Sequence, residues 1–230
     1  MSNDIAANLA AVKQRIKDAA VRSGRCADDV ELLVVSKTWS ADRVGEVVSA
    51  GHISFGENRV QEAEGKIPLL PDNLQWHLIG HLQRNKVRKA LPLFQTIHSI
   101  DSLKLARYTS NIASELGRKP DVYLQVDLAG EESKNGYEPD DLKRELDDLL
   151  ALDYLSIRGL MCIPPMAATP EDARPWFVKL RELRDELELH AGKSLPGLSM
   201  GMSGDYEVAI EEGSTIVRVG SAIFGSRSYS

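Results

Sequence analysis

The sequence lacks the features of membrane-spanning and exported proteins. Its longest uninterrupted apolar runs have four residues, whereas a transmembrane helix needs about 20. The first residues have neither the basic segment nor the apolar segment of a signal peptide. We therefore expect a cytoplasmic protein without a membrane partner.

Cysteine and positive charge are also scarce. Cys26 and Cys162, the two cysteines, form neither a CxxC pair nor a disulfide framework, so we expect reduced thiols. The 28 Lys and Arg residues against 34 Asp and Glu residues give a formal net charge of −6. This balance does not favour the basic face that binding to nucleic acid requires, so we expect no nucleic-acid partner. The motifs of P-loop, zincin and serine-hydrolase sites are absent.

Eight short apolar segments, typical of strands buried on both faces, alternate with segments of helical composition. The strand candidates span residues 32–35, 53–55, 76–79, 96–100, 122–126, 157–163, 198–202 and 215–219. Strict alternation requires crossover connections and hence parallel strands. Eight such strands close into a (β/α)8 TIM barrel, so we predict an α/β fold with a single domain over residues 1–230. An open doubly wound sheet is the alternative, because periodicity does not separate the two.

A further helix is expected before the first strand. Its apolar residues recur at helical spacing, at Ile5, Leu9, Val12 and Ile16. Asn3 stands where a capping residue would be. We interpret this helix as an extra element of the barrel and expect it to cover the barrel bottom.

Lys37 stands directly after the first apolar run, in Ser36-Lys37-Thr38. In a parallel barrel, functional groups emerge at the carboxyl ends of the strands. A lysine there would point its amine toward the barrel mouth or the core, where desolvation makes it a usable Schiff-base nucleophile. The alternative is a lysine whose side chain extends from the strand end into solvent.

Two segments of small residues end the last two strand candidates, at residues 199–205 and 218–221. Backbone N–H groups, hydroxyls and a helix N-terminus suit a phosphate dianion. The loops after strands seven and eight are also the frequent phosphate site of this fold. Tight turns and close strand packing are the alternative for each segment taken singly. Together with Lys37, the segments suggest a phosphorylated aldehyde or ketone as ligand.

His77 and His81 have the i, i+4 spacing of a zinc pair. That spacing brings two ligands together only on a helix, and on the expected strand the residues would lie roughly 13 Å apart. We therefore expect no metal site.

Six segments occur in the order of a known family. They are LVVSKT (33–38), FGENRVQE (55–62), WHLIGHLQRNK (76–86), GLMCIP (159–164), LSMGMS (198–203) and VRVGSAIFG (217–225). Together they resemble the pyridoxal phosphate homeostasis proteins, a YggS-type family with an alanine-racemase-like barrel. The resemblance extends over nearly the whole chain and implies the barrel domain of fold-type III enzymes.

The resemblance implies that pyridoxal 5′-phosphate (PLP) is bound as a covalent internal aldimine on Lys37. Seven further residues would complete the site: Asn58 and His77 at neighbouring strand ends, Met161 in the pocket wall, Arg218 at the pyridine nitrogen, and Ser203, Gly220 and Ser221 at the phosphate. For Asn58, His77 and Met161 the assignment depends on the resemblance alone. A capped turn, a strand-end histidine and a core methionine are the alternatives.

The same resemblance implies a role in intracellular PLP homeostasis, as a non-catalytic carrier and regulator that affects amino-acid and keto-acid balance. The partners would be PLP and apo forms of PLP-dependent enzymes, and we expect a monomer. Related fold-type III enzymes add a β-domain that supplies an opposing catalytic group, and we expect no such group here because the sequence has only five residues after the last motif. The alternatives are a PLP-dependent amino-acid racemase and a Schiff-base aldolase acting on a sugar phosphate.

Overall fold

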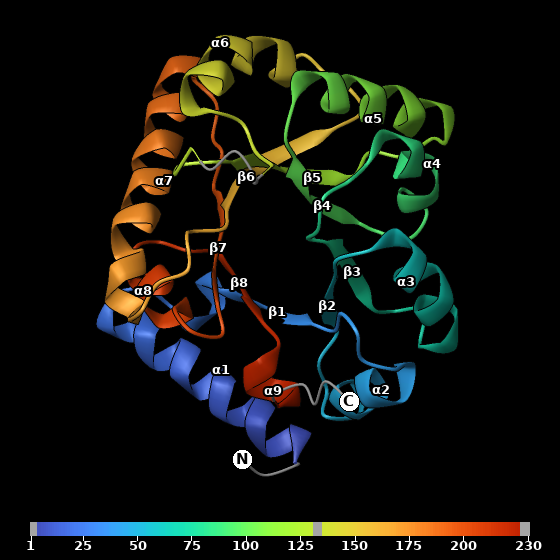
Figure 1. The fold of residues 1–230 in the computed structure, drawn as a ribbon, viewed down its shortest axis with the longest axis vertical. Coiled ribbons are helices and arrows are strands. Elements are labelled where there is room, and N and C mark those ends of the chain that lie inside the picture. The colour runs from blue at the N-terminus through green and yellow to red at the C-terminus, as the bar shows by residue number, and fades with distance from the viewer. Residues whose placement is uncertain (1–3, 131–134, 226–230) are drawn as a thin grey trace.

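The eight strands form a closed parallel barrel (Figure 1). The structure, a computed structural model, describes residues 4–130 and 135–225. Each strand pairs with the next one in the chain, and β8 (Ile216–Val219) pairs with β1 (Glu31–Val35) to close the ring. The predicted α/β barrel is confirmed, and the open doubly wound sheet is excluded.

The intermediate strands are β2 (Ser54–Glu57), β3 (Gln75–Leu78), β4 (Thr96–Ile100), β5 (Asp121–Val126), β6 (Ser156–Cys162) and β7 (Gly197–Met202). The helices are α1 (Ile5–Arg22), α2 (Ala41–Ser49), α3 (Val60–Lys66), α4 (Val87–Ala90), α5 (Leu103–Glu115), α6 (Pro139–Leu150), α7 (Pro170–Ala191), α8 (Tyr206–Glu211) and α9 (Ser221–Phe224). A helix follows each strand, as parallel pairing requires. None of the described helices has the length and apolar character needed to cross a membrane.

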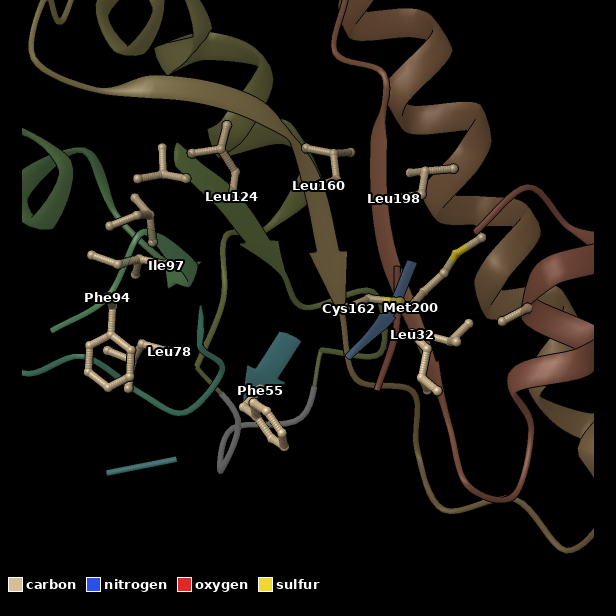
Figure 2. Packing of buried hydrophobic residues seen from close by; sticks show 14 of the residues in the cluster. Leu32, Phe55, Leu78, Phe94, Ile97, Leu124, Leu160, Cys162, Leu198 and Met200 are labelled. Carbon is tan, nitrogen blue, oxygen red and sulfur yellow. The ribbon is translucent and has the colours of Figure 1, made fainter. Parts of the chain in front are cut away.

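Strand side chains alternate between the two faces of the barrel wall, because a strand has a period of two residues. On β1, Leu32 and Val34 belong to the apolar layer between strands and helices, whereas Leu33 and Val35 belong to the barrel interior. Figure 2 shows part of the outer layer, including Leu32. The inner apolar cluster is small and consists of Leu33, Val35, Ile79, Tyr123, Met161 and Ile216.

Helix α1 packs on the side of the barrel, against α8, α9 and α2, and not across the bottom where we expected it (Figure 1). The helices near this side are short, with six residues in α8 and four in α9. The buried stripe of α1 supplies the missing cover and joins the outer apolar layer. Asp4 caps the helix by accepting from the N–H of Ala7 at 3.0 Å. Asn3, the expected cap, lies outside the described residues.

Candidate functional site

A cavity of about 510 Å³ opens at the carboxyl ends of the strands. Its wall contains six of the eight residues predicted for the site: Lys37, Asn58, Ser203, Arg218, Gly220 and Ser221. These residues come from the ends of β1, β2, β7 and β8, so barrel closure gathers both ends of the chain around one space. The volume lies within the usual range for small-molecule sites.

Lys37 lies in the turn that follows β1 and is half-buried. The next residue, Thr38, has a φ of 69°, in the left-handed region that strains a β-branched residue by about 1–2 kcal/mol. The N–H of Thr38 donates to Glu62 Oε1 at 2.5 Å, and the carbonyl oxygen of Ser36 accepts from Lys66 Nζ at 2.9 Å. The peptide groups on both sides of Lys37 are therefore held in place.

Asn58 follows β2 directly and is half-buried in the cavity wall. Its backbone lies against Gly80, where a Cβ would come within 2.2 Å of the carbonyl oxygen of Asn58. Glycine at position 80 therefore allows the ends of β2 and β3 to approach closely, and this approach sets the position of Asn58.

The loops after β7 and β8 contact each other and β1. The N–H of Gly220 donates to Ser203 Oγ at 3.2 Å. A Cβ on Gly220 would lie 3.0 Å from the carbonyl oxygen of Val35. Within the part of the chain that the structure describes, the N–H groups of Ser203, Gly204 and Ser221 donate to no protein acceptor. Backbone donors of this kind favour an anion, so the two loops can hold a phosphate group.

Arg218 extends from β8 to the cavity wall, although only 4% of the residue is exposed. Its Nη1 donates to the carbonyl oxygen of Ser199 at 2.6 Å and to Ser199 Oγ at 2.8 Å, and its Nη2 donates to the carbonyl oxygen of Cys162 at 2.8 Å. Burial lowers the pKa of this guanidinium below its ordinary value. A guanidinium has donors only, so Arg218 presents fixed N–H donors to the cavity.

A chain of hydrogen bonds continues from Arg218 through the barrel interior. Ser199 Oγ lies 2.8 Å from His98 Nδ1, and His98 Nε2 lies 2.9 Å from His77 Nδ1. A serine hydroxyl has one donor and two acceptor sites, so Ser199 can accept from Arg218 and donate to His98 Nδ1. In that arrangement a neutral His98 carries its proton on Nε2 and donates to His77. His77 Nε2 in turn faces Glu31 Oε1 at 3.7 Å.

Both histidines of this chain favour the neutral form. Burial is the main reason that the pKa of His77 is lowered and that the pKa of His98 is lowered well below the ordinary value of 6.5. The neighbouring His77 and the cation of Arg218 lower the pKa of His98 further. The histidines behind Ser199 therefore place no second positive charge near the guanidinium of Arg218.

His77 and Met161, the other two predicted residues, do not line the cavity. His77 is 5% exposed and bonds to His98, and Met161 is fully buried in the inner apolar cluster. Each lies two positions before a strand-end residue that does reach the cavity, Ile79 and Ile163 respectively. A period of two puts them on the same inner face but one layer deeper. The structure therefore does not bring them together with the other six.

Sequence analysis missed the polar residues on the β3 and β5 side of the cavity: His81, Gln125, Asp127 and Asn135. His81 Nδ1 lies 3.1 Å from Asp101 Oδ2, and Gln125 Nε2 donates to the carbonyl oxygen of Asn135 at 2.6 Å. His81 and Asp127 follow strand ends, so the same strand-end rule that selected Lys37 could have found them. No group of three or more His, Cys, Asp or Glu residues among those described could hold a metal ion.

Known protein sequences match the chain over almost its full length. The model of the family "Alanine racemase, N-terminal domain" matches residues 5–228. The pyridoxal phosphate homeostasis protein of Aquifex aeolicus is 46% identical over 222 residues, which cover 96% of this chain and 97% of the relative. The protein of the same name from Escherichia coli is 41% identical over 243 residues and covers 99% of each chain.

Solved structures agree with this similarity. PipY of Synechococcus elongatus with PLP bound is 41% identical and has a TM-score of 0.86, covering 96% of this chain and 100% of PipY. Alanine racemase of Clostridium difficile has a TM-score of 0.73 at 17% identity, covering 99% of this chain and 57% of the racemase. The likeness to the racemase concerns the fold alone.

The buried histidines predict how stability depends on pH. Below about pH 6.5 the unfolded chain takes up protons that the folded chain does not, because the folded pKa of His98 is depressed. The free energy of unfolding should therefore fall as pH decreases, by up to about 1.4 kcal/mol per pH unit for each such histidine. In His98→Gln the free energy of unfolding should depend less steeply on pH between about pH 6.5 and 5. The difference in slope should correspond to about one proton. Chemical denaturation at a series of pH values measures it.

The matched control is His190→Gln, because the His190 side chain is 60% exposed. Its slope should equal that of the wild type. An unchanged slope in His98→Gln would show that His98 takes up a proton in the folded state.

Proposed function

The chain belongs to the family of pyridoxal phosphate homeostasis proteins, and from this premise we propose that it carries PLP covalently on Lys37 at the barrel mouth and passes it to other proteins. One observation supports this most directly: a single cavity contains Lys37 and the backbone donors of the loops after β7 and β8. An aldehyde that also bears a phosphate needs this combination.

Each part of the cofactor corresponds to a separate part of the cavity wall. PLP supplies a reactive aldehyde and an electron-withdrawing pyridine ring when it is bound. Lys37 Nζ would condense with the aldehyde carbon, with release of one water molecule. Ser203, Gly220 and Ser221 would bind the phosphate through hydroxyl and N–H groups, and Asn58 would contact the ring from the end of β2.

Arg218 would face the pyridine nitrogen. Its guanidinium is held by two carbonyl oxygens and Ser199 Oγ, and it can only donate. A donated N–H and a nearby cation keep the ring nitrogen unprotonated, which weakens the ring as an electron sink. This arrangement suits little chemistry on a bound amino acid beyond racemisation.

Few residues of the cavity wall could act as a second base for racemisation. Among the described residues, the wall contains no tyrosine and no lysine other than Lys37. Tyr206, the first residue of α8 after the β7 loop, could be proposed as an opposing base, but it is 1% exposed and its hydroxyl is buried. His81 and Asp127 are the remaining wall residues that could move a proton. The racemase alternative therefore depends on His81 or Asp127.

Lys37 is predicted to form the covalent link. Lys37→Ala should purify without the absorption band of the imine, and borohydride reduction of the wild type followed by peptide mapping should find the pyridoxyl group on residue 37. Lys89→Ala is the control, because Lys89 is exposed and paired with Glu64. A pyridoxyl group found mainly on another lysine would show that the assignment is wrong.

The phosphate is predicted to supply much of the affinity. Pyridoxal, which lacks it, should bind about 100-fold or more weakly, because at least two charge-assisted hydrogen bonds are lost. Ser203→Ala should weaken PLP binding but leave pyridoxal binding unchanged. Equilibrium dialysis with both compounds measures these affinities. Equal affinity for the two compounds would argue against a phosphate site in these loops.

The carrier role is predicted to appear as transfer without racemisation. Loaded protein mixed with an apo-aminotransferase should restore the activity of that enzyme, with free PLP at the same concentration as reference. Incubation with enantiomers of alanine, serine and glutamate, followed by chiral chromatography, should show no turnover above the Lys37→Ala control. Turnover that disappears in His81→Gln, combined with no transfer, would favour the racemase.

A further inference from the structure

We propose that Glu57, Glu62 and Lys66 are positioning residues for Lys37, because they hold the peptide groups on both sides of it from behind the barrel wall. We call these three residues the buried cluster. None of the three lines the cavity, so the cluster would act on Lys37 through the turn and not through the ligand. This inference depends on the proposed role of Lys37.

The buried cluster lies on the outer face of the strands. Gly56 faces the interior, where a Cβ would lie 3.1 Å from Leu33 and 3.3 Å from Ile79. Glu57 follows Gly56 on β2 and therefore points outward, toward the helices. It meets Lys66, the last residue of α3, through an ion pair of 2.6 Å.

The ammonium group of Lys66 connects the cluster to the turn. Its Nζ donates to Glu57 Oε1 at 2.6 Å, to Glu62 Oε1 at 2.8 Å and to the carbonyl oxygen of Ser36 at 2.9 Å. These three bonds use all the donors of an ammonium group. Lys66 is thus fully occupied and cannot compete with Lys37 as a nucleophile.

Each carboxylate then makes one contact with the turn. Glu57 Oε1 accepts from Ser36 Oγ at 2.7 Å, and Glu62 Oε1 accepts from the N–H of Thr38 at 2.5 Å. Ser36 is therefore fixed by its carbonyl and its side chain, and Thr38 by its N–H. Lys37 lies between these two fixed residues.

Stability gives little reason for such a cluster. Glu57 is fully buried and Lys66 is 5% exposed, and apolar replacements for buried ion pairs are often equally stable or more stable. Positioning gives a better reason, because Thr38 has a φ of 69° that a β-branched residue avoids when unrestrained. Loss of its bond to Glu62 would let the turn relax and move Lys37 relative to the phosphate loops.

The test separates formation of the covalent bond from binding of the ligand. Glu62 is the residue to change, because its side chain is 25% exposed and its removal leaves the buried pair of Glu57 and Lys66 intact. Apo protein is mixed with PLP, and the imine absorbance is followed by stopped flow. Binding of pyridoxine 5′-phosphate, whose alcohol cannot condense with an amine, is measured in parallel.

Glu62→Ala should slow imine formation about tenfold, the effect of losing one charge-assisted hydrogen bond. Glu62→Gln, which keeps an oxygen acceptor for the N–H of Thr38, should stay within about threefold of the wild type. Glu64→Ala, on the same helix and paired with exposed Lys89, is the control and should match the wild type. Affinity for pyridoxine 5′-phosphate should change less than about twofold in every variant.

The possible results separate this inference from the proposed function. An unmodified Lys37 in the wild type would overturn the proposed function itself. Normal modification of Lys37 with equal rates in Glu62→Ala and the wild type would overturn the positioning role. A parallel loss of pyridoxine 5′-phosphate binding would also overturn it, because it would show a general structural effect.

Discussion

Pairing between β8 and β1 is the contact on which the site depends. The register pairs Glu31 with Ile216 and Val34 with Val219, so the two strands end side by side. Gly220 therefore lies beside Val35, where a Cβ would come 3.0 Å from the carbonyl oxygen of Val35, and it lines the same cavity as Lys37. In an open sheet the first and last strands would not pair, and the amine would be separated from the loop after β8. Closure of the barrel thus brings two strand ends that are far apart in the sequence to the same cavity.

The fold could be predicted from the sequence because its signal is local and repeated. Each strand is a short apolar run, and each helix between them enforces parallel pairing. The strand ends then pointed to Lys37 and to the loops of Ser203 and Gly220. The position of α1 could not be predicted in this way, because amphipathicity shows which face of a helix is buried but not which element covers it.

The sequence also did not predict how deep in the barrel interior each inward-facing side chain lies. His77 and Ile79 share the inner face of one wall segment, yet Ile79 lines the cavity and His77 does not. Whether a residue on the inner face lines the cavity or lies below it depends on where its strand ends. The sequence would have to give that end to within two residues. The hydrogen bonds in the barrel interior could not be predicted for another reason. His98 and Ser199 are 101 positions apart, and no local sequence pattern connects them.

The inner and outer faces of the barrel wall fix different residues at the carboxyl ends of the strands. On the inner face, Ser199 and the backbone carbonyl of Cys162 hold the cation of Arg218, and two neutral histidines continue the hydrogen-bond chain behind Ser199. On the outer face, the buried cluster holds the turn that contains Lys37. The charged groups of the buried cluster are thus kept behind the wall, away from the cavity. The cavity wall contains Lys37 from the turn, the residues of the loops after β7 and β8, and the strand residues Gln125 and Arg218.

The order of the strands along the chain also determines when this site can come into existence during protein synthesis. β1 leaves the ribosome early, but its partner β8 follows only after all the other strands have been made. Contacts between such distant segments form late and slowly. A nascent or truncated chain without β8 would have the lysine but not the adjoining anion-binding loop. Occupancy by a phosphorylated ligand would therefore mark chains that have completed folding, and interrupted translation products would not withdraw that ligand from the cell.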